Sequence, residues 1–336
     1  MLRTTSFVTG GFTCVNRRIL SRVWYSNGAN DDNCDRLKHK SITKPVDPSA
    51  RVLRHIQFTK RMPFQQGLAI QEQFVRANLD MKKVQSKIEQ KLVELEHEYQ
   101  GNATINSNEK QILDKILAMK PNPMVLTFEY EPTYTGGKRI KKVITQEQIS
   151  QLENFKPTKD IMNPSPKFVQ VERGGELTFH GPGQIVAYIV LDLKAFKNFP
   201  ARCLISVIET AAKNTLKIAP VRKGGLPLNI DTKRVGDKIG VWVMNDDKIA
   251  SIGVHVRRSI TSHGICINVC PDLSYLNNFE MCGNPDGKAT SILNEFPNAN
   301  VTIQDISIAF VRELAKLLGI DTVERMQTDG SEMNQL

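Results

Sequence analysis

The feature that most constrains this chain is a nearly continuous apolar run, QIVAYIVLDL, at residues 184–193. A strand with one solvated face alternates apolar and polar residues, whereas a strand covered on both faces is apolar throughout. The run is too short to cross a bilayer, which takes about 18 apolar residues or more, and no stretch of the chain approaches that length. We therefore expect it to form a central strand in a sheet that lies between two layers.

Helices and short strands surround this run in an irregular order. Apolar residues recur at helical spacing from just after Pro63 to about Tyr99, at residues 201–217 and at residues 303–318. Strand-like runs are RHIQF, KFVQVE, PLNI, KIGVWV, KIASIGVHV and GICINV, and the last four follow one another closely enough to form antiparallel meanders. The pattern predicts an α+β fold in which helices flank a mixed, largely antiparallel central sheet.

The length and composition of the chain predict one folded domain, at residues 51–322, with a tail on either side. Residues 27–50 are polar and contain two prolines, which is typical of a linker, and residues 323–336 are expected to form a flexible tail. A lysine-rich stretch at about residues 138–167 contains three prolines, so we expect it to be an insertion that leaves the core.

The first 26 residues have the composition of a mitochondrial transit peptide. They contain serine and threonine, no acidic residue precedes Asp31, and their positive charge comes from Arg3, Arg17, Arg18 and Arg22. A disordered basic tail is the simpler alternative. Targeting would place the protein in the mitochondrial matrix, a reducing compartment that suits a chain with six cysteines.

The ionisable residues do not indicate a metal or a nucleic acid. The cysteines show no CxxC spacing, and His180, His255, His263 and Cys266 match no ligand template, so we expect no metal site. The formal net charge of +10 suits acidic protein partners or nucleic acid, but aromatic residues make up only 7% of the chain and no nucleic-acid-binding motif is present. The run GNPDGKAT lacks the spacing and the Ser or Thr of a P-loop.

Two residues have the chemistry of acyl transfer, Lys248 and Cys282. A cysteine is nucleophilic as a thiolate, and a lysine beside it could stabilise the thiolate as an ammonium or, as a neutral amine, accept and return a proton. Taken singly, each residue has a simpler explanation, because a cysteine is often buried in a core and a lysine that follows an acidic pair is often a solvated turn residue.

A glycine-rich segment, RGGELTFHGPGQ at residues 173–184, precedes both residues. Gly174 and Gly175 permit a turn that brings backbone N–H groups close to a ligand, and Gly181 and Gly183 permit a second turn before the buried strand. The segment therefore fits the wall of a pocket, although two turns that flank a hairpin need no ligand. Arg173 and His180 have the same two explanations, since each can contact a substrate or simply bond to the backbone.

The order of these segments resembles that of a known enzyme family. RGGELTFHGPGQ, GVWVMNDDKIASIGVHVRR, SHGICINV and MCGNPDGKATSI follow one another as the signature blocks of lipoyl(octanoyl) transferases do, and VLTFEYEPTYTGGKR resembles an earlier block of that family. The resemblance implies the fold of biotin and lipoate protein ligases. With the arginine-rich start, it indicates the mitochondrial form of the family.

The resemblance also implies a role for individual residues. Cys282 would be the acyl-thioester nucleophile and Lys248 its activating partner. The family's substrate-binding segments fall on Arg173, Gly174, Gly175, Glu176, Leu177, Thr178, Phe179, His180, Ser251, Ile252, Gly253, Gly264, Ile265 and Cys266. Three positions depart from the family pattern, since Tyr130 and Glu131 replace a His-Pro pair and Met281 replaces the proline before the cysteine.

Membership would imply transfer of an octanoyl group from octanoyl-acyl carrier protein to a lysine of a lipoyl domain, as a step of protein lipoylation and lipoate biosynthesis. The acceptors would be the E2 subunits of 2-oxoacid dehydrogenases and the H protein of glycine cleavage. The donor is an activated thioester, so no cofactor is expected, and we expect the enzyme to be a monomer. The alternatives are an ATP-dependent lipoate or biotin protein ligase, which needs no catalytic cysteine, and a non-catalytic adaptor that binds lipoyl domains.

Overall fold

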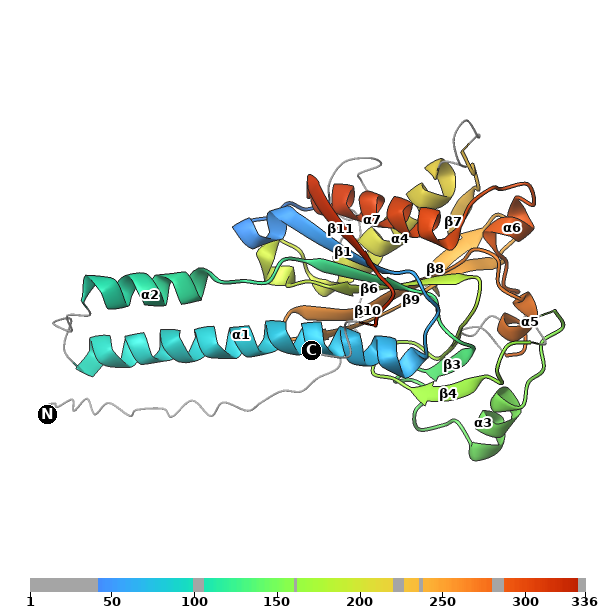
Figure 1. Cartoon of the computed structure of the whole chain (residues 1–336), viewed down its shortest axis with the longest axis horizontal. Helices are drawn as coiled ribbons and strands as arrows, with labels where there is room; N and C mark the ends of the chain where they lie inside the picture. The colour runs from blue at the N-terminus through green and yellow to red at the C-terminus, as the bar shows by residue number, and fades with distance from the viewer. Residues whose placement is uncertain are drawn as a thin grey trace, which may run out of the picture.

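A computed structural model describes residues 42–98, 106–159, 162–219, 227–235, 238–279 and 287–331 (Figure 1). Its main sheet has eight strands in the order β11-β1-β2-β6-β10-β9-β8-β7. The strands are β1 (Val52–Phe58), β2 (Met124–Phe128), β6 (Gln184–Val190), β7 (Thr232–Val235), β8 (Lys238–Val243), β9 (Lys248–Arg257), β10 (Ile260–Asn268) and β11 (Thr322–Thr328). β1 pairs in parallel with β2 and β11, and every other pair is antiparallel, which confirms the mixed, largely antiparallel sheet.

Helices cover both faces of the main sheet. On one face lie α4 (Ala201–Ile218) and α7 (Ile303–Leu318), which pack side by side, and on the other lies the first part of α1 (Phe64–Glu98). The remaining helices are α2 (Ser107–Ala118), α3 (Gln146–Glu153), the short α5 (Leu273–Leu276) and α6 (Ile292–Glu295), and the 3₁₀ turns Pro48–Arg51 and Leu193–Ala195. Among the described residues, no helix is long and apolar enough to traverse a bilayer.

Residues 184–190 of the expected apolar run form β6 in the middle of the main sheet, and every residue of β6 is buried. Ile185, Ala187 and Ile189 face α4 and α7, whereas Val186 and Tyr188 face α1. Side chains alternate across a strand, so both faces of β6 must be apolar when helices cover both sides. The expectation of a strand between two layers is confirmed.

The helices α7 and α1 begin where the local sequence predicts. α7 begins with a capping box, in which Thr302 and Asp305 bond to each other's backbone N–H, and it ends at Gly319, which has the left-handed φ of 68° that glycine adopts without strain. α1 begins directly after Pro63, which can occupy the start of a helix because it has no N–H to leave unbonded.

A second sheet of three strands, in the order β4-β3-β5, lies beside the main one. Its strands are β3 (Thr133–Gly136), β4 (Lys167–Gln170) and β5 (Leu177–His180), and all residues of β3 and β5 are buried. The stretch expected as an insertion at residues 138–167 connects β3 to β4 and contains α3, whose Leu152 packs in the core of this sheet. The insertion is therefore attached to the body of the protein.

Two expectations about the ends of the domain need correction. The tail expected from residue 323 starts inside a strand, because β11 continues to Thr328 and pairs in parallel with β1 along its whole length. Without β11, β1 would be the edge strand and would leave N–H and C=O groups unpaired; β11 supplies their partners and forms the edge itself. At the other end, the last part of the expected linker is bound to the body, since the backbone N–H of Ile42 donates to Leu317 and that of Val46 to Ala195. The expected transit peptide lies outside the described residues.

The far part of α1 and α2 leave the body together as a projecting hairpin, which we call the arm (Figure 1). Gln85 joins the two helices where they leave the body, because its side-chain amide donates to the carbonyls of Leu117 at 3.1 Å and Met119 at 2.8 Å. α2, which is described in full, has no buried residue.

Candidate active site

A cavity lies between the start of α1, the RGG turn, β5, and the middle of β9 and β10. Most of the substrate-binding residues implied by the sequence line it, namely Arg173, Thr178, His180, Ser251, Ile252, Gly253, Gly264, Ile265 and Cys266. These residues come from three separate sequence segments. β9 and β10 align two of the segments because Gly253 pairs with Gly264 and Ser251 with Cys266 in the antiparallel register.

The rest of the expected binding segment does not line this cavity. Thr178 and His180 point into it, so the alternation of β5 turns Leu177 and Phe179 the other way. Phe179 stacks on Tyr275 with ring centroids 4.4 Å apart, in the core of the small sheet. Phe179 is therefore a packing residue in this structure.

Glu176 and Leu177 line a second cavity of about 810 Å³. Ile140 and Ile144, from the stretch after β3, line it too, together with Phe279. This cavity lies next to the point where the described chain stops before residues 280–286, the segment that contains Cys282.

Arg173 fastens the glycine turn to the wall of the first cavity. Its guanidinium donates to the carbonyl of Gly174 at 3.0 Å and to both the carbonyl and the hydroxyl of Thr135 at 2.8 Å. The turn rests directly on β9, where Gly174 N–H donates to Val254 at 3.1 Å and a Cβ on Gly253 would come within 2.9 Å of the Arg173 side chain. Glycine at position 253 is what allows this close approach.

The two histidines at the cavity are buried and electrically neutral. Burial, with the positive charge of Arg173 as a smaller cause, lowers the pKa of His180 well below its usual value and that of His263 to about 3. The His180 ring stacks on Phe64, with centroids 5.4 Å apart, and its Nδ1 has no hydrogen-bond partner among the described residues. The cavity wall therefore carries imidazole groups without the charge that would repel an alkyl chain.

Cys266 is the described cysteine that lines the cavity, and burial raises the pKa of its thiol well above the usual value. A thiol with a raised pKa remains protonated at neutral pH, and the protonated form is a poor nucleophile. Cys266 therefore suits the wall of the cavity and does not suit covalent catalysis.

Four lining residues were missed by the sequence analysis: Phe64, Val186, Tyr188 and His263. Val186 and Tyr188 were assigned to the buried strand, and only the position of α1 decides which face of that strand borders a cavity. Phe64 was seen as a helix start. His263 was considered only as a metal ligand, although its place beside Gly264 in SHGICINV was a usable signal.

Tyr130, which replaces the histidine of the family pattern, packs directly behind this wall. Its ring lies 4.9 Å from that of Phe64 and its hydroxyl fills the space over Gly67, where a Cβ would come within 2.0 Å. The larger side chain is therefore accommodated by a glycine in the first turns of α1.

Lys248 lies at the start of β9, and only 4% of its surface is exposed. Its Nζ sits 5.0 Å from the centre of the Trp242 ring, a cation–π distance. Gly240 makes room for the side chain, since a Cβ there would come within 2.8 Å of the Lys248 Cε. This burial excludes a solvated turn lysine, whereas the role of Lys248 in a site stays a prediction.

The backbone of Lys248 pairs with the chain that follows the cysteine segment. Its N–H donates to Lys288 at 2.7 Å and its carbonyl accepts from Thr290 at 3.0 Å. The side chain of Asn277 accepts from the N–H of Ala289 at 2.8 Å, so the chain before the segment is tied to the chain after it. Cys282 itself lies outside the described residues.

Within the described ranges, no group of three or more His, Cys, Asp or Glu side chains could hold a metal ion. The site as described is a cavity lined by both polar and apolar groups, with the Arg173 guanidinium in its wall and a buried lysine at the start of β9, one of the strands that line it.

Comparison with known proteins identifies the family. The model of lipoyl protein ligase A/B catalytic domains matches residues 102–315. The chain is 57% identical to a mitochondrial octanoyltransferase of Saccharomyces cerevisiae over 318 residues, which cover 94% of each chain, and 59% identical to one of Kluyveromyces lactis over 288 residues, which cover 85% and 86%.

The fold is also that of a lipoylation enzyme of known structure. A bipartite lipoate protein ligase of Thermoplasma acidophilum superposes with a TM-score of 0.50 at 12% identity, over 85% of this chain and 90% of the other. This likeness concerns the fold alone. The family match and the two yeast relatives, taken with the cavity of the RGG turn, show that the chain belongs to the family of lipoyl protein ligase A/B catalytic domains.

Proposed function

We propose that this protein is a mitochondrial octanoyltransferase that moves the octanoyl group of octanoyl-acyl carrier protein to a lysine of lipoyl domains, through a thioester on Cys282. The names of the two yeast relatives support the transfer and the compartment. The observation that carries the chemistry is the burial of Lys248 against the chain on the C-terminal side of the Cys282 segment. The matrix is the sub-compartment we propose, because octanoyl carrier and lipoyl domains must meet the enzyme in one solution.

In the first half-reaction the Cys282 thiolate attacks the thioester carbon of the donor. The tetrahedral oxyanion collapses, the bond to the pantetheine sulfur breaks, and the departing thiolate takes a proton for which Lys248 is the nearby source. The product of this step is octanoyl-Cys282 and a free carrier thiol.

In the second half-reaction the amine of the acceptor lysine attacks the octanoyl-Cys282 carbon. The carbon–sulfur bond breaks, the amide forms, and Cys282 is regenerated, while Lys248 takes the proton that the acceptor amine loses. The acceptors we propose are the lipoyl domains of 2-oxoacid dehydrogenase E2 subunits and the glycine cleavage H protein. The donor thioester supplies the energy of the amide bond.

The described cavity has a volume of about 30 Å³, less than an octanoyl chain occupies, so we propose that its wall contacts only part of the acyl group. Its walls include Phe64, Val186 and Ile265, and the two imidazoles that face it have lowered pKa values and carry no charge at neutral pH. Contact with these apolar side chains stabilises an alkyl chain, because burial of each methylene group contributes about 0.8 kcal/mol.

Intact-protein mass spectrometry after incubation with octanoyl carrier, without acceptor, tests the proposal. We expect one octanoyl adduct on the native enzyme, its discharge when a lipoyl domain is added, and no adduct on Cys282→Ser. Cys270→Ser is the matched control, since Cys270 is an exposed thiol outside the cavity. An adduct that persists in Cys282→Ser would contradict the proposal, and ATP-dependent use of free octanoate that survives Cys282→Ala would identify a ligase instead.

A further inference from the structure

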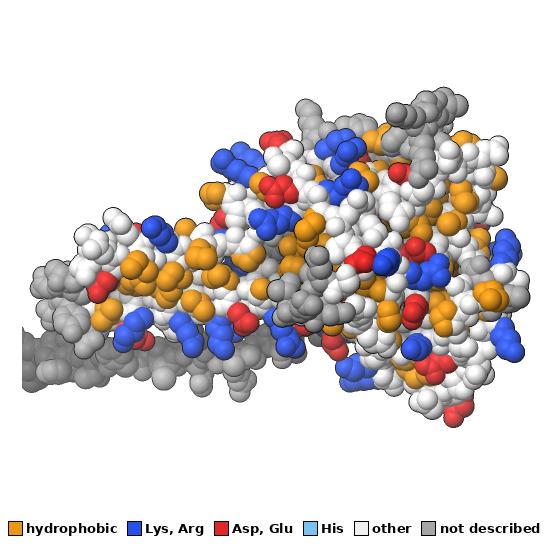
Figure 2. Space-filling model, viewed as in Figure 1, with side chains coloured by type: hydrophobic (Ala, Val, Ile, Leu, Met, Phe, Trp, Pro, Cys, Tyr) orange, Lys and Arg blue, Asp and Glu red, His pale blue; other side chains and the backbone are white. Residues whose placement is uncertain are grey.

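The arm leaves an apolar surface without cover. A groove of about 400 Å³ runs between its helices and is lined by Ile88, Leu92 and Leu95 of α1 and by Ile112 and Leu113 of α2. Figure 2 shows an orange band along the arm, with blue Lys and Arg side chains at its edges. Ile112 is 58% exposed, and two helices alone cannot enclose an apolar face of this size.

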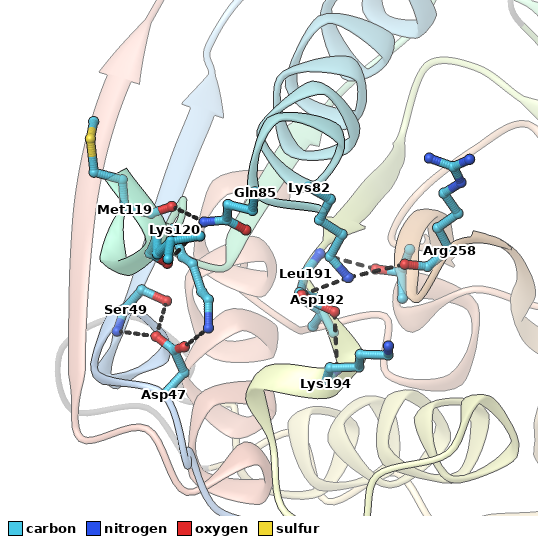
Figure 3. Close-up of polar contacts among 12 residues, drawn as sticks. Asp47, Ser49, Lys82, Gln85, Met119, Lys120, Leu191, Asp192, Lys194 and Arg258 are labelled. Carbon is cyan, nitrogen blue, oxygen red and sulfur yellow. Dashed lines mark hydrogen bonds and ion pairs between the residues drawn. The ribbon is translucent and has the colours of Figure 1, made fainter. Parts of the chain in front are cut away.

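The base of the arm is held firmly, so the band cannot be hidden by folding the arm back. Lys82 of α1 contacts the Asp192 carboxylate at 2.7 Å and donates to the carbonyl of Arg258 at 3.0 Å (Figure 3). Lys120, just after α2, pairs with Asp47, so both helices are fixed to the body. α1 precedes the part of the chain that matches the family model, whereas α2 lies within it.

The charges of the arm are separated along its length. Near the base lie Lys83 and Lys87, and neither forms an ion pair with any residue that the structure describes; they stand at four-residue spacing with Lys91, which lines the groove. Nearer the tip, Glu94 forms an ion pair with Lys91 at 3.2 Å, and Glu109 lines the groove. The base of the band is thus bordered by lysines that have no ion pair among the described residues, whereas the glutamates lie toward the tip.

We propose that the band is covered by the arm of a second copy of this chain, packed antiparallel so that the tip of each arm meets the base of the other. In this arrangement Lys87 of one copy faces Glu94 of the second, and by symmetry the same contact forms twice. The four helices enclose the two apolar bands as a bundle. A uniformly acidic partner or an anionic membrane would meet the glutamates of the tip with like charge, whereas a second copy complements both ends.

The size of the contact predicts a reversible dimer. From residue 83 to residue 98 the helix runs roughly 24 Å, and two helices side by side are roughly 20 Å wide, so each arm offers about 500 Å². The total of about 1,000 Å² is at the lower limit for a specific interface, and we expect a dissociation constant on the order of micromolar. This dimer replaces the monomer expected from the sequence, and it leaves the cavity at the opposite end of α1 open.

Sedimentation velocity of the full chain over a range of concentrations tests the proposal. We expect a monomer–dimer equilibrium that Ile112→Asp weakens by tenfold or more. Val93→Asp is the matched control, because Val93 is an exposed apolar residue of the same helix pair that does not line the groove. Lys87→Glu should weaken the dimer, and the combined Lys87→Glu and Glu94→Lys should restore it. Octanoyl transfer at low enzyme concentration should be unchanged in every variant, which shows that the body remains folded.

A protein that stays monomeric at all concentrations, or a dimer that survives Ile112→Asp, overturns the proposal. So does a charge exchange that fails to restore association, because only the antiparallel contact brings residues 87 and 94 of different copies together. Binding to vesicles that contain an anionic lipid, lost in Ile112→Asp and seen without self-association, would assign the band to a membrane surface and overturn it as well.

Discussion

The wall of the cavity and the arm differ in how they bury their side chains. Every residue of β10 in the wall is buried, and a Cβ on its one glycine, Gly264, would meet the backbone of the neighbouring strand, whereas α2 of the arm has no buried residue. A wall of this kind has one arrangement, because atoms on both sides of the strand leave no space for another. The arm consists of two helices whose apolar side chains stay partly exposed. The comparison suggests that catalysis depends on the first region and association on the second.

The largest effect is expected from Lys248→Met, which removes the amine and keeps the length of the buried side chain. If the lysine moves protons for Cys282, transfer should fall roughly 100- to 10,000-fold. We expect the melting temperature to change little, since Met suits the buried position beside Trp242. Lys288→Met, at an exposed neighbouring lysine, is the control. A loss of less than tenfold in kcat/KM would show that Lys248 is a packing residue.

The next largest effect is expected at the glycines of the wall, and it is an effect on stability. A Cβ on Gly264 would come within 2.3 Å of the Ala187 carbonyl, and neighbouring strands would have to separate, so Gly264→Ala should cost about 1–3 kcal/mol in urea unfolding. Gly174→Ala is the contrast, because the nearest atom, the Val254 carbonyl, is 3.7 Å away. Equal losses for the two variants would contradict the tight packing that we attribute to β10.

The smallest effect is expected at the arm. Gln85→Leu removes two hydrogen bonds to the C-terminal end of α2, each of which contributes about 0.5–1.5 kcal/mol. Hydrogen exchange of the α2 amides should accelerate roughly tenfold or more, while octanoyl transfer stays constant. Gln90→Leu, at an exposed position farther along α1, serves as the control. Loss of transfer in Gln85→Leu would show that the two regions are coupled after all.

The elements of the fold were largely predictable from local pattern. α1 and α7 appeared where apolar residues recur at helical spacing, and β6 where they are continuous. The strand β11 was missed because its apolar residues are few and its side chains mostly exposed, so its place depends on hydrogen bonds to β1 and not on hydrophobic pattern. The strand order of the small sheet could not be predicted either, since β4 pairs with β3, which lies about thirty residues earlier in the sequence.

The sequence by itself determined which reactive residues and which structural signals the chain contains. These are a lysine and a cysteine in segments with a recognisable order, a glycine turn with a neighbouring arginine, and a strand that must lie between two layers. These are properties of residue type and spacing, which the chain carries before it folds. Cys282 remains a prediction of this kind, because it lies outside the described residues.

Only the tertiary structure decided which of the expected binding residues share a cavity. The alternation of side chains along β5 divides its residues between two sides of the strand. The register of β9 and β10 aligns two distant sequence segments. The position of α1 leaves Tyr188 lining the cavity, where the sequence had placed it in the core. The same helix, continued past the body, creates the exposed band of the arm. The physical reason is that burial belongs to a side chain together with its neighbours, and neighbours far apart in the sequence meet only when the chain is folded.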